Sequence, residues 1–359
     1  MKFTQTKIAE VLQMKKIFTF NSSKITMMLV MTLLIFSLEN PLLVLATNTA
    51  TCSTGVGSSP KGDRMDSTSS NVWIGLSGTH QLGHSSTSST SSCSVSTNTA
   101  QNDPTNVAFA GNGYLAFTQK GTGGSSQSCI SSYNTATSTI VKTSCISGAG
   151  ADDVDKDPTN SNMVWSSWYY NGYVGKFDTS LGNLSTFLPP SCGVTSNLEG
   201  LRVDSSGNVW AADEACNKLW KYVPSSNTWT SYTISGFLPW YLSIDNSASH
   251  IWITSQSNTL KALADFNIST GTAATISYPG SAQGATEVAQ DPANRITFVA
   301  FQNGYVNEYY NSLGSWQCTG SGDSYSNGTP FGISYSQSGG VDYYWATLYG
   351  NSQLVVGHC

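Results

Sequence analysis

Charge is scarce in this sequence. Only 10% of the 359 residues are charged, and 16 Lys and Arg stand against 21 Asp and Glu, for a formal net charge of −5. The basic residues are scattered, whereas binding to a phosphate backbone needs them clustered, so the sequence argues against nucleic acid as a partner. The shortage of charge does not mean disorder. Hydrophobic residues make up 39% and aromatic residues 11% of the chain, which is enough to build a large core.

Long apolar runs are also missing, except near the N-terminus. Lysines precede an apolar run over residues 27–38, and a small-residue exit follows at residues 44–46. This order is typical of a signal peptide. We expect residues 1–46 to be a signal peptide, or alternatively an uncleaved anchor that would be the only route to a membrane. Residues 47–359 would then form one domain that is secreted or held at the cell surface.

Close cysteine pairs are absent too. None of the eight cysteines forms a C-x-x-C pair, the spacing that thiolate metal sites use. All eight follow the signal segment, and an even number behind an export signal indicates disulfide bonds in an oxidising compartment. The exported part also holds N-glycosylation sequons, which fit surface loops. They lie at Asn183, Asn267 and Asn327.

Helical periodicity is absent after the signal segment, while Gly and Asn turns recur every few residues. A repeated unit takes its place. Residues 198–213 contain a short strand, an Asp-Ser-Ser-Gly-Asn turn and a second strand that begins Val-Trp. Looser copies recur about every 42 to 50 residues, a period typical of one four-stranded propeller blade. The large residues on the second strands of successive copies are Trp73, Leu115, Trp165, Trp210, Trp252, Phe298 and Trp345.

These seven copies predict an all-β fold, a seven-bladed β-propeller of four-stranded antiparallel blades. Neither face of one blade is buried until neighbours stack on it, so the large residue of each copy should fill the wedge between two blades. The last copy leaves room for only three strands before the chain ends. We expect residues 49–57 to add the fourth strand there, which closes the ring and removes an open edge.

The best copy carries a specific motif. Residues 203–212 read Val-Asp-Ser-Ser-Gly-Asn-Val-Trp-Ala-Ala, and residues 217–224 read Asn-Lys-Leu-Trp-Lys-Tyr-Val-Pro. This pattern resembles the blades of the virginiamycin B lyase family and, more loosely, of the SMP-30/gluconolactonase and NHL groups. The other copies within residues 60–359 match it loosely. The resemblance implies a propeller that is a magnesium-dependent lyase on a cyclic peptide lactone, a metal-dependent lactonase, or a binding protein without catalysis.

Ligand sites of propellers normally lie around the channel mouth. There the loops into the innermost strands and the loops between second and third strands share one face. Three acids fall at entry positions of different blades: Asp152, Glu199 and Glu287. Carboxylates that converge at a narrow mouth repel each other unless they share a cation, and Ca²⁺ and Mg²⁺ prefer such oxygen ligands. These acids are our candidate metal site; the alternative is solvated rim carboxylates that only set turns.

Other residues of the same face are candidates for ligand binding, because acids and aromatic rings there could hold a polar or a ring-shaped ligand. The aromatic residues among them could equally serve packing between blades. These candidates are Asp153, Asp213, Glu214, Trp168, Tyr169 and Trp240.

The histidines weigh against catalysis. The lyase resemblance implies a histidine base from a late blade beside the mouth, and none of the chain's four histidines falls at that position. We therefore expect a propeller that binds a small molecule, a glycan or a protein at the mouth without catalysis. A lyase or lactonase that depends on Ca²⁺ or Mg²⁺ is the alternative.

The predicted blades suggest two local disulfide bonds. Cys129 and Cys145 flank a turn at residues 134–139, so a hairpin would place them opposite each other. Cys192 enters the fourth blade and Cys216 leaves its second strand, so both fall on the mouth face. We expect each of these pairs to form a bond.

The remaining cysteines leave two arrangements open. If residues 49–57 close the ring, Cys52 begins beside Cys359, and a bond between them would lock the ring shut. That arrangement leaves Cys93 to pair with Cys318, which come from the first and sixth blades. The alternative pairs Cys52 with Cys93 and Cys318 with Cys359.

Overall fold

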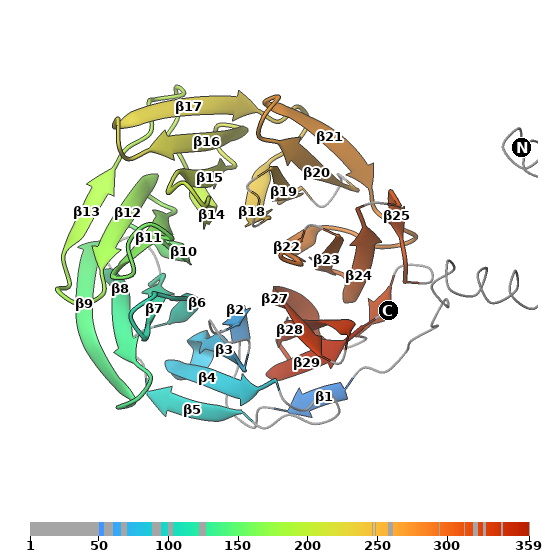
Figure 1. Cartoon of the computed structure of the whole chain (residues 1–359), viewed down its shortest axis with the longest axis horizontal. Helices are drawn as coiled ribbons and strands as arrows, with labels where there is room; N and C mark the ends of the chain where they lie inside the picture. The colour runs from blue at the N-terminus through green and yellow to red at the C-terminus, as the bar shows by residue number, and fades with distance from the viewer. Residues whose placement is uncertain are drawn as a thin grey trace, which may run out of the picture. The chain divides into compact units, whose positions relative to one another are not determined.

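The repeated strands form seven antiparallel sheets, which stand as blades around a common axis (Figure 1). The computed structural model describes residues 50–53, 60–65, 70–87, 95–99, 103–121, 127–245, 247, 249–257, 261–293, 295–311, 313–318, 322–325, 328–338 and 340–358. The predicted signal segment lies outside these residues. The predicted all-β, seven-bladed propeller of four-stranded blades is confirmed. Within the described residues, no helix has the length and apolarity needed to cross a membrane.

The blades follow one another along the chain, and each runs from an innermost to an outermost strand. Blade 1 consists of β2 (Pro60–Met65), β3 (Asn71–Leu76), β4 (Gln81–Ser86) and β5 (Ser96–Thr99), with the short 3₁₀ helix η1 (Ser77–Thr79) after β3. Blade 2 consists of β6 (Pro104–Phe109), β7 (Tyr114–Gln119), β8 (Gln127–Asn134) and β9 (Thr139–Ser147). Blade 3 consists of β10 (Ala151–Lys156), β11 (Met163–Trp168), β12 (Tyr173–Asp178) and β13 (Leu184–Phe187). Blade 4 consists of β14 (Leu198–Val203), β15 (Val209–Asp213), β16 (Lys218–Val223) and β17 (Thr228–Thr233).

The later blades keep this order. Blade 5 consists of β18 (Pro239–Ile244), β19 (His250–Ser255), β20 (Ala262–Asn267) and β21 (Thr272–Ser277). Blade 6 consists of β22 (Ala285–Gln290), β23 (Ile296–Phe301) and β24 (Tyr305–Tyr310), with the outer position split between β25 (Ser315–Trp316) and β26 (Asp323–Ser324). Blade 7 consists of β27 (Thr329–Ser338), β28 (Val341–Tyr349), β29 (Gln353–Gly357) and β1 (Ala50–Ser53).

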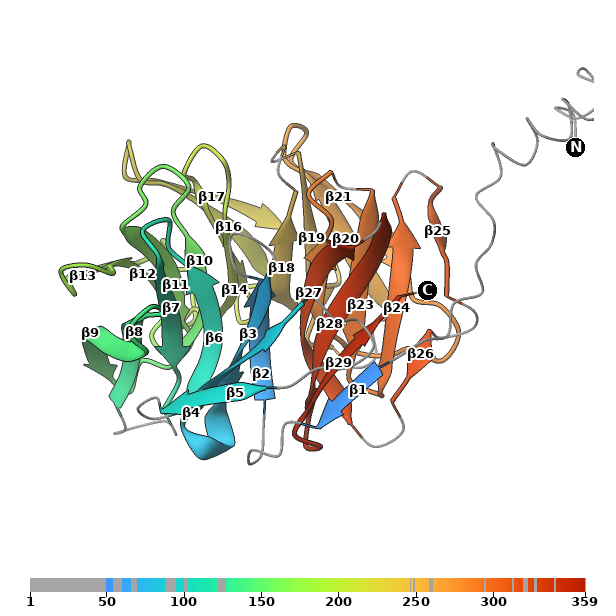
Figure 2. The same cartoon turned by 60° about the horizontal axis from the view of Figure 1, so that its bottom comes forward.

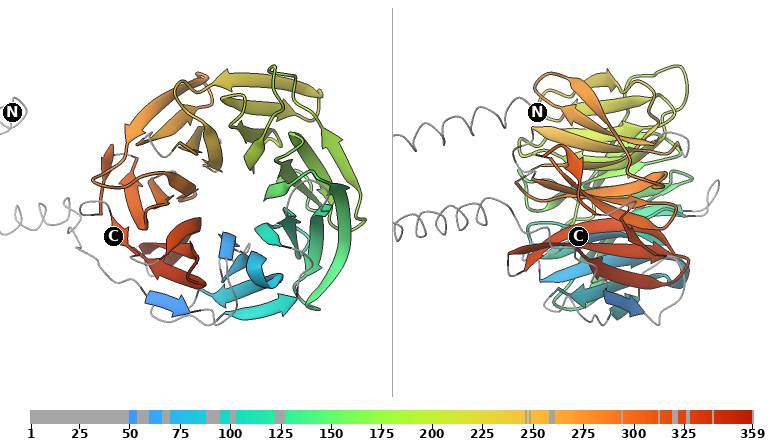
Figure 3. Two further views of the ribbon diagram at one scale, coloured as in Figure 1. Left: turned by 180° about the vertical axis from the view of Figure 1, so that it is seen from behind. Right: turned by 90° about the vertical axis from the view of Figure 1, so that its right-hand side faces the viewer.

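The ring is closed by the N-terminal strand, as predicted. β1 pairs antiparallel with β29, with Ala50 opposite Val356, and becomes the outermost strand of blade 7 (Figure 2). Seen from behind, the closed ring shows β1 at the outer edge beside blade 1 (Figure 3). Blade 7 therefore joins the two ends of the propeller, and its outer edge is paired.

The predicted large residues hold the blades together. Each lies on the second strand of its blade and is buried. Trp165 of blade 3 packs with Leu201 and Ala211 of blade 4. Trp210 of blade 4 packs with Leu242 of blade 5. Full burial of one large apolar side chain contributes about 1.5–3 kcal/mol, so these wedges are a main source of the ring's stability.

The aspartate of the blade motif, Asp204, has a structural role. Asp204 turns the chain by accepting backbone N–H groups from Ser206 at 3.0 Å and Asn208 at 2.9 Å. Its second oxygen accepts the indole N–H of Trp210 at 3.0 Å. In blade 3 the same bond joins Trp165 to a turn acid, Asp157, at 3.1 Å. A buried indole needs an acceptor, and the motif supplies one from its own turn.

Two disulfide predictions are confirmed. Cys129 and Cys145 lie opposite each other on β8 and β9 and are bonded, with their Cα atoms 4.1 Å apart. Cys192 is bonded to Cys216, with a Cα separation of 5.9 Å. Cys318 is also disulfide-bonded.

The ring-closing disulfide stays a prediction. The backbone of Cys52 lies opposite Leu354 in the pairing of β1 with β29. The side chain of Cys52, together with Cys93 and Cys359, lies outside the described residues. Of the predicted glycosylation positions, Asn183 is exposed before β13, Asn267 is half-buried at the end of β20, and Asn327 is outside the described residues.

Every innermost strand carries a bulge at the same place. The pairing register between first and second strands shifts between the first and fourth residues of β2, β6, β10, β14, β18 and β22. In β27 it shifts between the second and fifth residues, Pro330 and Ile333. In β10 the two residues inside the bulge are Asp152 and Asp153. A bulge frees its residues from the ladder and redirects their side chains. The repeat thus presents two residues per blade at equivalent places, which we call the bulge positions.

Adjacent blades are joined at the bulge backbone. Thr118 of blade 2 donates to the carbonyl oxygen of Asp152 in blade 3, and Ser167 of blade 3 donates to that of Glu199 in blade 4. Thr347 of blade 7 donates to the carbonyl of Lys61 in blade 1 at 2.7 Å. These bonds satisfy carbonyl groups that the bulge removed from the ladder.

One buried acid breaks the apolar pattern that follows the bulge. The residue directly after the bulge positions is Val, Leu or Ile in the other blades, but it is Asp63 in β2. Asp63 is fully buried, and neither of its carboxyl oxygens has a hydrogen-bond partner within the described part of the chain. Burial, and next the charge of Glu287, raise the pKa of Asp63 well above its ordinary value. The fold therefore favours the neutral acid.

We predict that Asp63→Asn stabilises the protein at neutral pH. Because the folded-state pKa is raised, the wild-type contribution is present below the unfolded pKa of about 3.9 and is lost as pH rises toward the folded pKa. Near pH 3.5 the two proteins should unfold at similar temperatures, whereas at pH 7 the variant should gain on the order of 1–3 kcal/mol. Thermal unfolding across this pH range measures the difference.

Asp178→Asn is the matched control. Although burial raises the pKa of Asp178, hydrogen bonds from Ser180 and Leu181 outweigh it and lower the pKa overall. Its loss should therefore destabilise the protein at pH 7. An Asp63→Asn variant that is less stable than wild type at pH 7 would contradict the prediction.

Candidate functional site

The candidate residues gather where the innermost strands begin. Asp152 and Asp153 occupy the bulge positions of β10, Glu199 one of β14, Trp240 one of β18, and Glu287 one of β22. They thus lie within strands rather than in the loops before them. We call this end of the ring the mouth.

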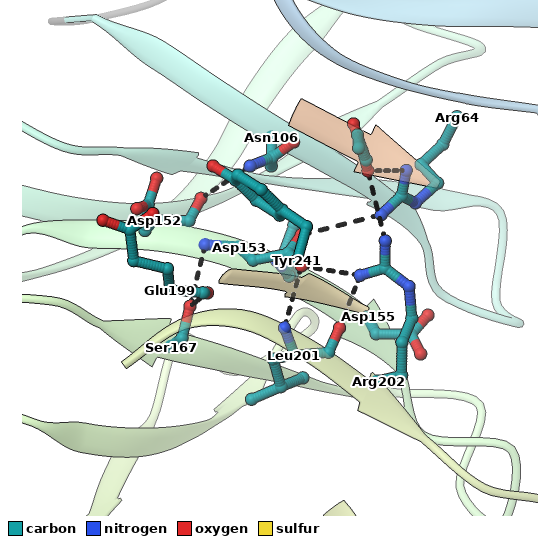
Figure 4. Close-up of polar contacts among 12 residues, drawn as sticks. Arg64, Asn106, Asp152, Asp153, Asp155, Ser167, Glu199, Leu201, Arg202 and Tyr241 are labelled. Carbon is teal, nitrogen blue, oxygen red and sulfur yellow. Dashed lines mark hydrogen bonds and ion pairs between the residues drawn. The ribbon is translucent and has the colours of Figure 1, made fainter. Parts of the chain in front are cut away.

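Four charges, of which all but Arg64 are buried, meet across the axis at the mouth. Arg202 contacts Asp153 at 2.6 Å and Glu287 at 3.2 Å. Arg64 contacts Glu287 at 2.7 Å and Asp153 at 3.7 Å. Figure 4 shows Arg64 and Arg202 close together, with Asp153 joined to both. Because these residues come from blades 1, 3, 4 and 6, the four-charge network connects distant blades of the ring.

The network satisfies its own charges. Asp153 also accepts the backbone N–H of Leu201 at 2.9 Å, and Glu287 accepts that of Ile333 at 3.3 Å. Burial alone would lower the pKa of Arg64, but the attraction of Glu287 and Asp153 outweighs burial and raises that pKa. Each acid therefore has two cations and a backbone donor, so these residues are committed to structure.

A second group of charges lies beside the network. Lys120 contacts Asp152 at 2.8 Å, and its ammonium lies 4.5 Å from the ring centre of Tyr169. The hydroxyl of Tyr169 donates to Glu214 at 2.9 Å. Lys120 is thus shared between a carboxylate and an aromatic face, which fixes its position.

Glu199 differs from the other acids at the bulge positions, Asp152, Asp153 and Glu287, which have partners. Its side chain is 5% exposed and has no hydrogen bond or ion pair among the described residues. Burial, and next the charge of Asp152, raise the pKa of Glu199 well above its ordinary value, although Lys120 draws it down. Nearly buried carboxyl groups normally have partners. An unpartnered one with a raised pKa, at the mouth, marks a candidate functional residue.

Aromatic rings line another part of the mouth. Trp240 lies next to Tyr241 with ring centres 5.4 Å apart, and both approach Phe331, at 6.3 Å and 6.2 Å. Phe331 in turn lies 6.1 Å from Tyr349. Burial, then nearby carboxylates including Asp152 and Glu199, raise the pKa of Tyr241, which keeps its hydroxyl protonated. We call Trp240, Tyr241, Phe331 and Tyr349 the aromatic wall.

Of this wall, only Trp240 is among the ligand-binding candidates taken from the sequence. Tyr241 and Phe331 occupy bulge positions equivalent to those of Asp153 and Glu199. The sequence contains a signal for the two other rings at bulge positions, because Pro239-Trp-Tyr-Leu242 and Pro330-Phe-Gly-Ile333 align with Leu198-Glu-Gly-Leu201. The alignment of the seven entry segments would have placed both rings at the mouth.

Two predicted binding residues belong instead to the core. Trp168 is fully buried at the end of β11, and its indole donates to Ser166 at 2.9 Å. Asp213 is fully buried and accepts the indole N–H of Trp220 at 2.9 Å and the backbone N–H of Cys216 at 3.1 Å. Neither is placed to contact a ligand, because their polar atoms hold the loop between second and third strands.

Two of the three predicted metal ligands are paired with cations of the chain. Asp152 is paired with Lys120, and Glu287 is shared by Arg64 and Arg202. In the part of the chain that the structure describes, no group of three His, Cys, Asp or Glu side chains could hold a metal ion. These residues do not fit one divalent cation shared by all three acids. Binding of Ca²⁺ or Mg²⁺ stays a prediction.

The comparisons with known proteins identify the fold. No protein-family model and no curated protein matches the chain. Among solved structures, a catalytically inactive virginiamycin B lyase from Staphylococcus aureus with quinupristin matches with a TM-score of 0.70 and 11% identity, over 87% of this chain and 99% of that one. A streptogramin B lyase matches with a TM-score of 0.70 and 12% identity, over 87% and 97%. The Cps50 (Swd1) propeller domain from Myceliophteria thermophila matches with 0.67 and 10%, over 88% and 99%. At such identities the likeness supports a β-propeller and no narrower family.

We predict that Arg202→Met strongly destabilises the propeller. The substitution keeps much of the side-chain length but leaves Asp153 and Glu287 buried with Arg64 as their only remaining cation. Breaking a buried ion pair from one side costs about 3–5 kcal/mol. Chemical denaturation at pH 7 measures the loss.

Arg295→Met provides the matched control. Arg295 also contacts two acids, Asp291 at 2.8 Å and Asp342 at 3.5 Å, but half of its side chain is exposed. An exposed pair contributes about 1 kcal/mol or less. Equal losses in the two variants would show that the four-charge network is not a special source of stability.

Proposed function

We propose that this protein is an exported binding propeller that takes its ligand at the mouth, against Glu199 and the aromatic wall. Glu199 is the observation on which the proposal depends. Glu199 is 5% exposed, and its carboxyl group keeps a little contact with water but has no hydrogen bond or ion pair among the described residues. A ligand that donates a hydrogen bond would supply one.

The charges of the mouth indicate the ligand's chemistry. Asp152, Glu199 and Glu214 carry three acidic groups, whereas Lys120 and Lys61 supply the cations that act on Glu199. A positively charged amine would balance this excess and favour the ionised form of Glu199. Trp240 and Phe331 would cover an apolar ring attached to that amine. We therefore propose a small molecule or peptide with an amine close to an apolar ring.

The proposed export is supported by the disulfide bonds and not by the residues of the mouth. The bonds Cys129–Cys145 and Cys192–Cys216 are stable in an oxidising compartment and are rare in the cytosol. They fit the signal peptide predicted for residues 1–46. A glycosylated, secreted or surface-held protein is consistent with both.

We predict that phenethylamine, used as a probe, binds more tightly as pH rises from 5 to 8. Ionisation of Glu199, whose pKa is raised, creates the partner for the ammonium group. Glu199→Gln should remove this pH dependence and weaken binding at pH 8 by about 10- to 100-fold, the value of a hydrogen bond to a charged group. Calorimetric titration measures both effects.

The controls separate the site from general charge effects. Benzyl alcohol tests the ring without the amine and should not show the pH dependence. Asp103→Asn removes a more exposed acid, paired with His80 at 3.1 Å, and should bind like wild type. Amine binding that is unchanged in Glu199→Gln, or no binding at any pH, would refute this site.

A lyase or lactonase is the second candidate function. It is supported by the likeness to virginiamycin B lyase and by the raised pKa of Glu199, because a carboxyl group with a raised pKa is suited to proton transfer. Incubation with quinupristin, with and without added Mg²⁺, followed by mass spectrometry tests this candidate. A linear product that disappears in Glu199→Gln would establish it, and no product would reject lyase activity on this substrate.

A further inference from the structure

The bulges place seven equivalent side chains around the mouth. The first residue of each bulge is, in blade order, Lys61, Thr105, Asp152, Glu199, Trp240, Thr286 and Phe331. Three of these side chains are used by the fold. The two threonines donate to backbone carbonyl groups, Thr105 at 3.3 Å and Thr286 at 2.8 Å, and Asp152 is paired with Lys120. The charges that remain for a ligand are those of Lys61 and Glu199, beside two aromatic rings.

Lys61 is anchored through its backbone and not through its charge. Its carbonyl oxygen accepts the hydroxyl of Thr347 at 2.7 Å. Gly332 of blade 7 packs against the same carbonyl, since a Cβ on this glycine would lie 2.7 Å from its oxygen. The half-buried side chain of Lys61 makes no hydrogen bond or ion pair among the described residues. Its ammonium group, which has three donors, is therefore available to an anion.

Lys61 and Glu199 act on each other without forming an ion pair. They lie on β2 and β14, which stand on different sides of the axis (Figure 1). Burial raises the pKa of Glu199, and the charge of Lys61 draws that pKa down, so the two groups are close enough for their charges to interact. A ligand that carries both an ammonium group and a carboxylate can satisfy two such opposite charges at once.

A carboxylate at the mouth is directed toward Lys61 by the other charges. Lys120 is already held by Asp152 and by the ring of Tyr169, and both arginines belong to the four-charge network. Asp152 and Glu214, whose charges act on Glu199, would repel a carboxylate placed beside them. Adding a carboxylate to an amine ligand should therefore weaken binding unless that group reaches Lys61.

We propose that Lys61 is the carboxylate-binding residue of the mouth, and that the ligand is a free aromatic amino acid in its zwitterionic form. The ammonium group meets Glu199, the carboxylate meets Lys61, and the ring lies against Trp240 and Phe331, whose ring centres are 6.3 Å apart. The inference rests on the proposed function for the amine and the ring, and it adds the carboxylate. Such a site selects free amino acids over the N-termini of peptides, in which that carboxylate is part of an amide bond.

Three ligands that share a phenyl ring test the inference by calorimetric titration at pH 8. Phenylalanine carries both charges, phenethylamine carries the ammonium group alone, and 3-phenylpropionate carries the carboxylate alone. We expect phenylalanine to bind about tenfold tighter than phenethylamine, the lower value for a hydrogen bond to a charged group. 3-Phenylpropionate should bind more weakly than phenylalanine, because it leaves Glu199 without a partner.

Lys61→Met removes the charge and keeps most of the side-chain length. It should abolish the advantage of phenylalanine over phenethylamine. The ratio of the two affinities is the readout, because both ligands use Glu199 and any effect of Lys61 on that carboxylate cancels. Lys61→Arg keeps the charge and should keep an advantage for phenylalanine. Thermal unfolding shows whether each variant keeps the fold.

Lys156→Met is the matched control. Lys156 is exposed and ends β10, so the substitution removes the same charge from the opposite end of an innermost strand. It should leave the affinity ratio as it is in the wild type.

Two results would overturn the inference: phenylalanine that binds no tighter than phenethylamine, or an affinity ratio that Lys61→Met leaves unchanged. Either result leaves the mouth proposal standing as long as Glu199→Gln weakens the binding of phenethylamine. If neither ligand binds, or if Glu199→Gln weakens the binding of neither, the mouth proposal is rejected and this inference with it.

Discussion

The innermost strands of a propeller converge on one axis, and charges carried there must neutralise each other, because little water reaches them. In this protein Arg64, Asp153, Arg202 and Glu287 meet that requirement as one network. Every member sits on a different blade. The positions of blades 1, 3, 4 and 6 are therefore constrained by charge at the centre, as well as by the aromatic wedges and the hydroxyl-to-bulge hydrogen bonds between neighbours.

This network also decides which groups remain for function. Asp153 and Glu287 form ion pairs within the network, and Asp152 forms an ion pair with Lys120. Glu199 is left without a partner, although its bulge position is equivalent to that of Asp152. Its pKa is raised because burial removes water and the neighbouring carboxylate adds repulsion. The same bulge that supplies structural charges in blades 3 and 6 supplies aromatic rings in blades 5 and 7, so one backbone feature produces the two unlike parts of the mouth.

The fold was largely predictable because its signals are local and repeated. Each Asp-turn-Trp unit is one inner hairpin, and in blades 3 and 4 its indole is bonded to its own turn acid. The spacing of Trp165, Trp210 and Trp252 gives the blade length. The strand at residues 49–57 was predictable because blade 7 lacked a partner. The residues of the candidate site were less predictable from the sequence. Trp168 and Asp213 were assigned to ligand binding, yet neither exposes its polar atoms. Burial depends on the neighbouring blade, which spacing along one blade cannot show.

The sequence by itself determined the number of blades and the disulfides Cys129–Cys145 and Cys192–Cys216, because hairpins and turns join residues that are near each other in the chain. It also determined the closing strand, because the last repeat unit lacks a fourth strand. Only the tertiary structure decided which acids are paired. Arg64 and Glu287 are 223 positions apart, and no pattern in either blade records their contact at 2.7 Å. Asp63 shows the same limit, since it occupies a position that is apolar in the other blades. Pairing of charges depends on distances across the axis, and those exist only once the ring has closed.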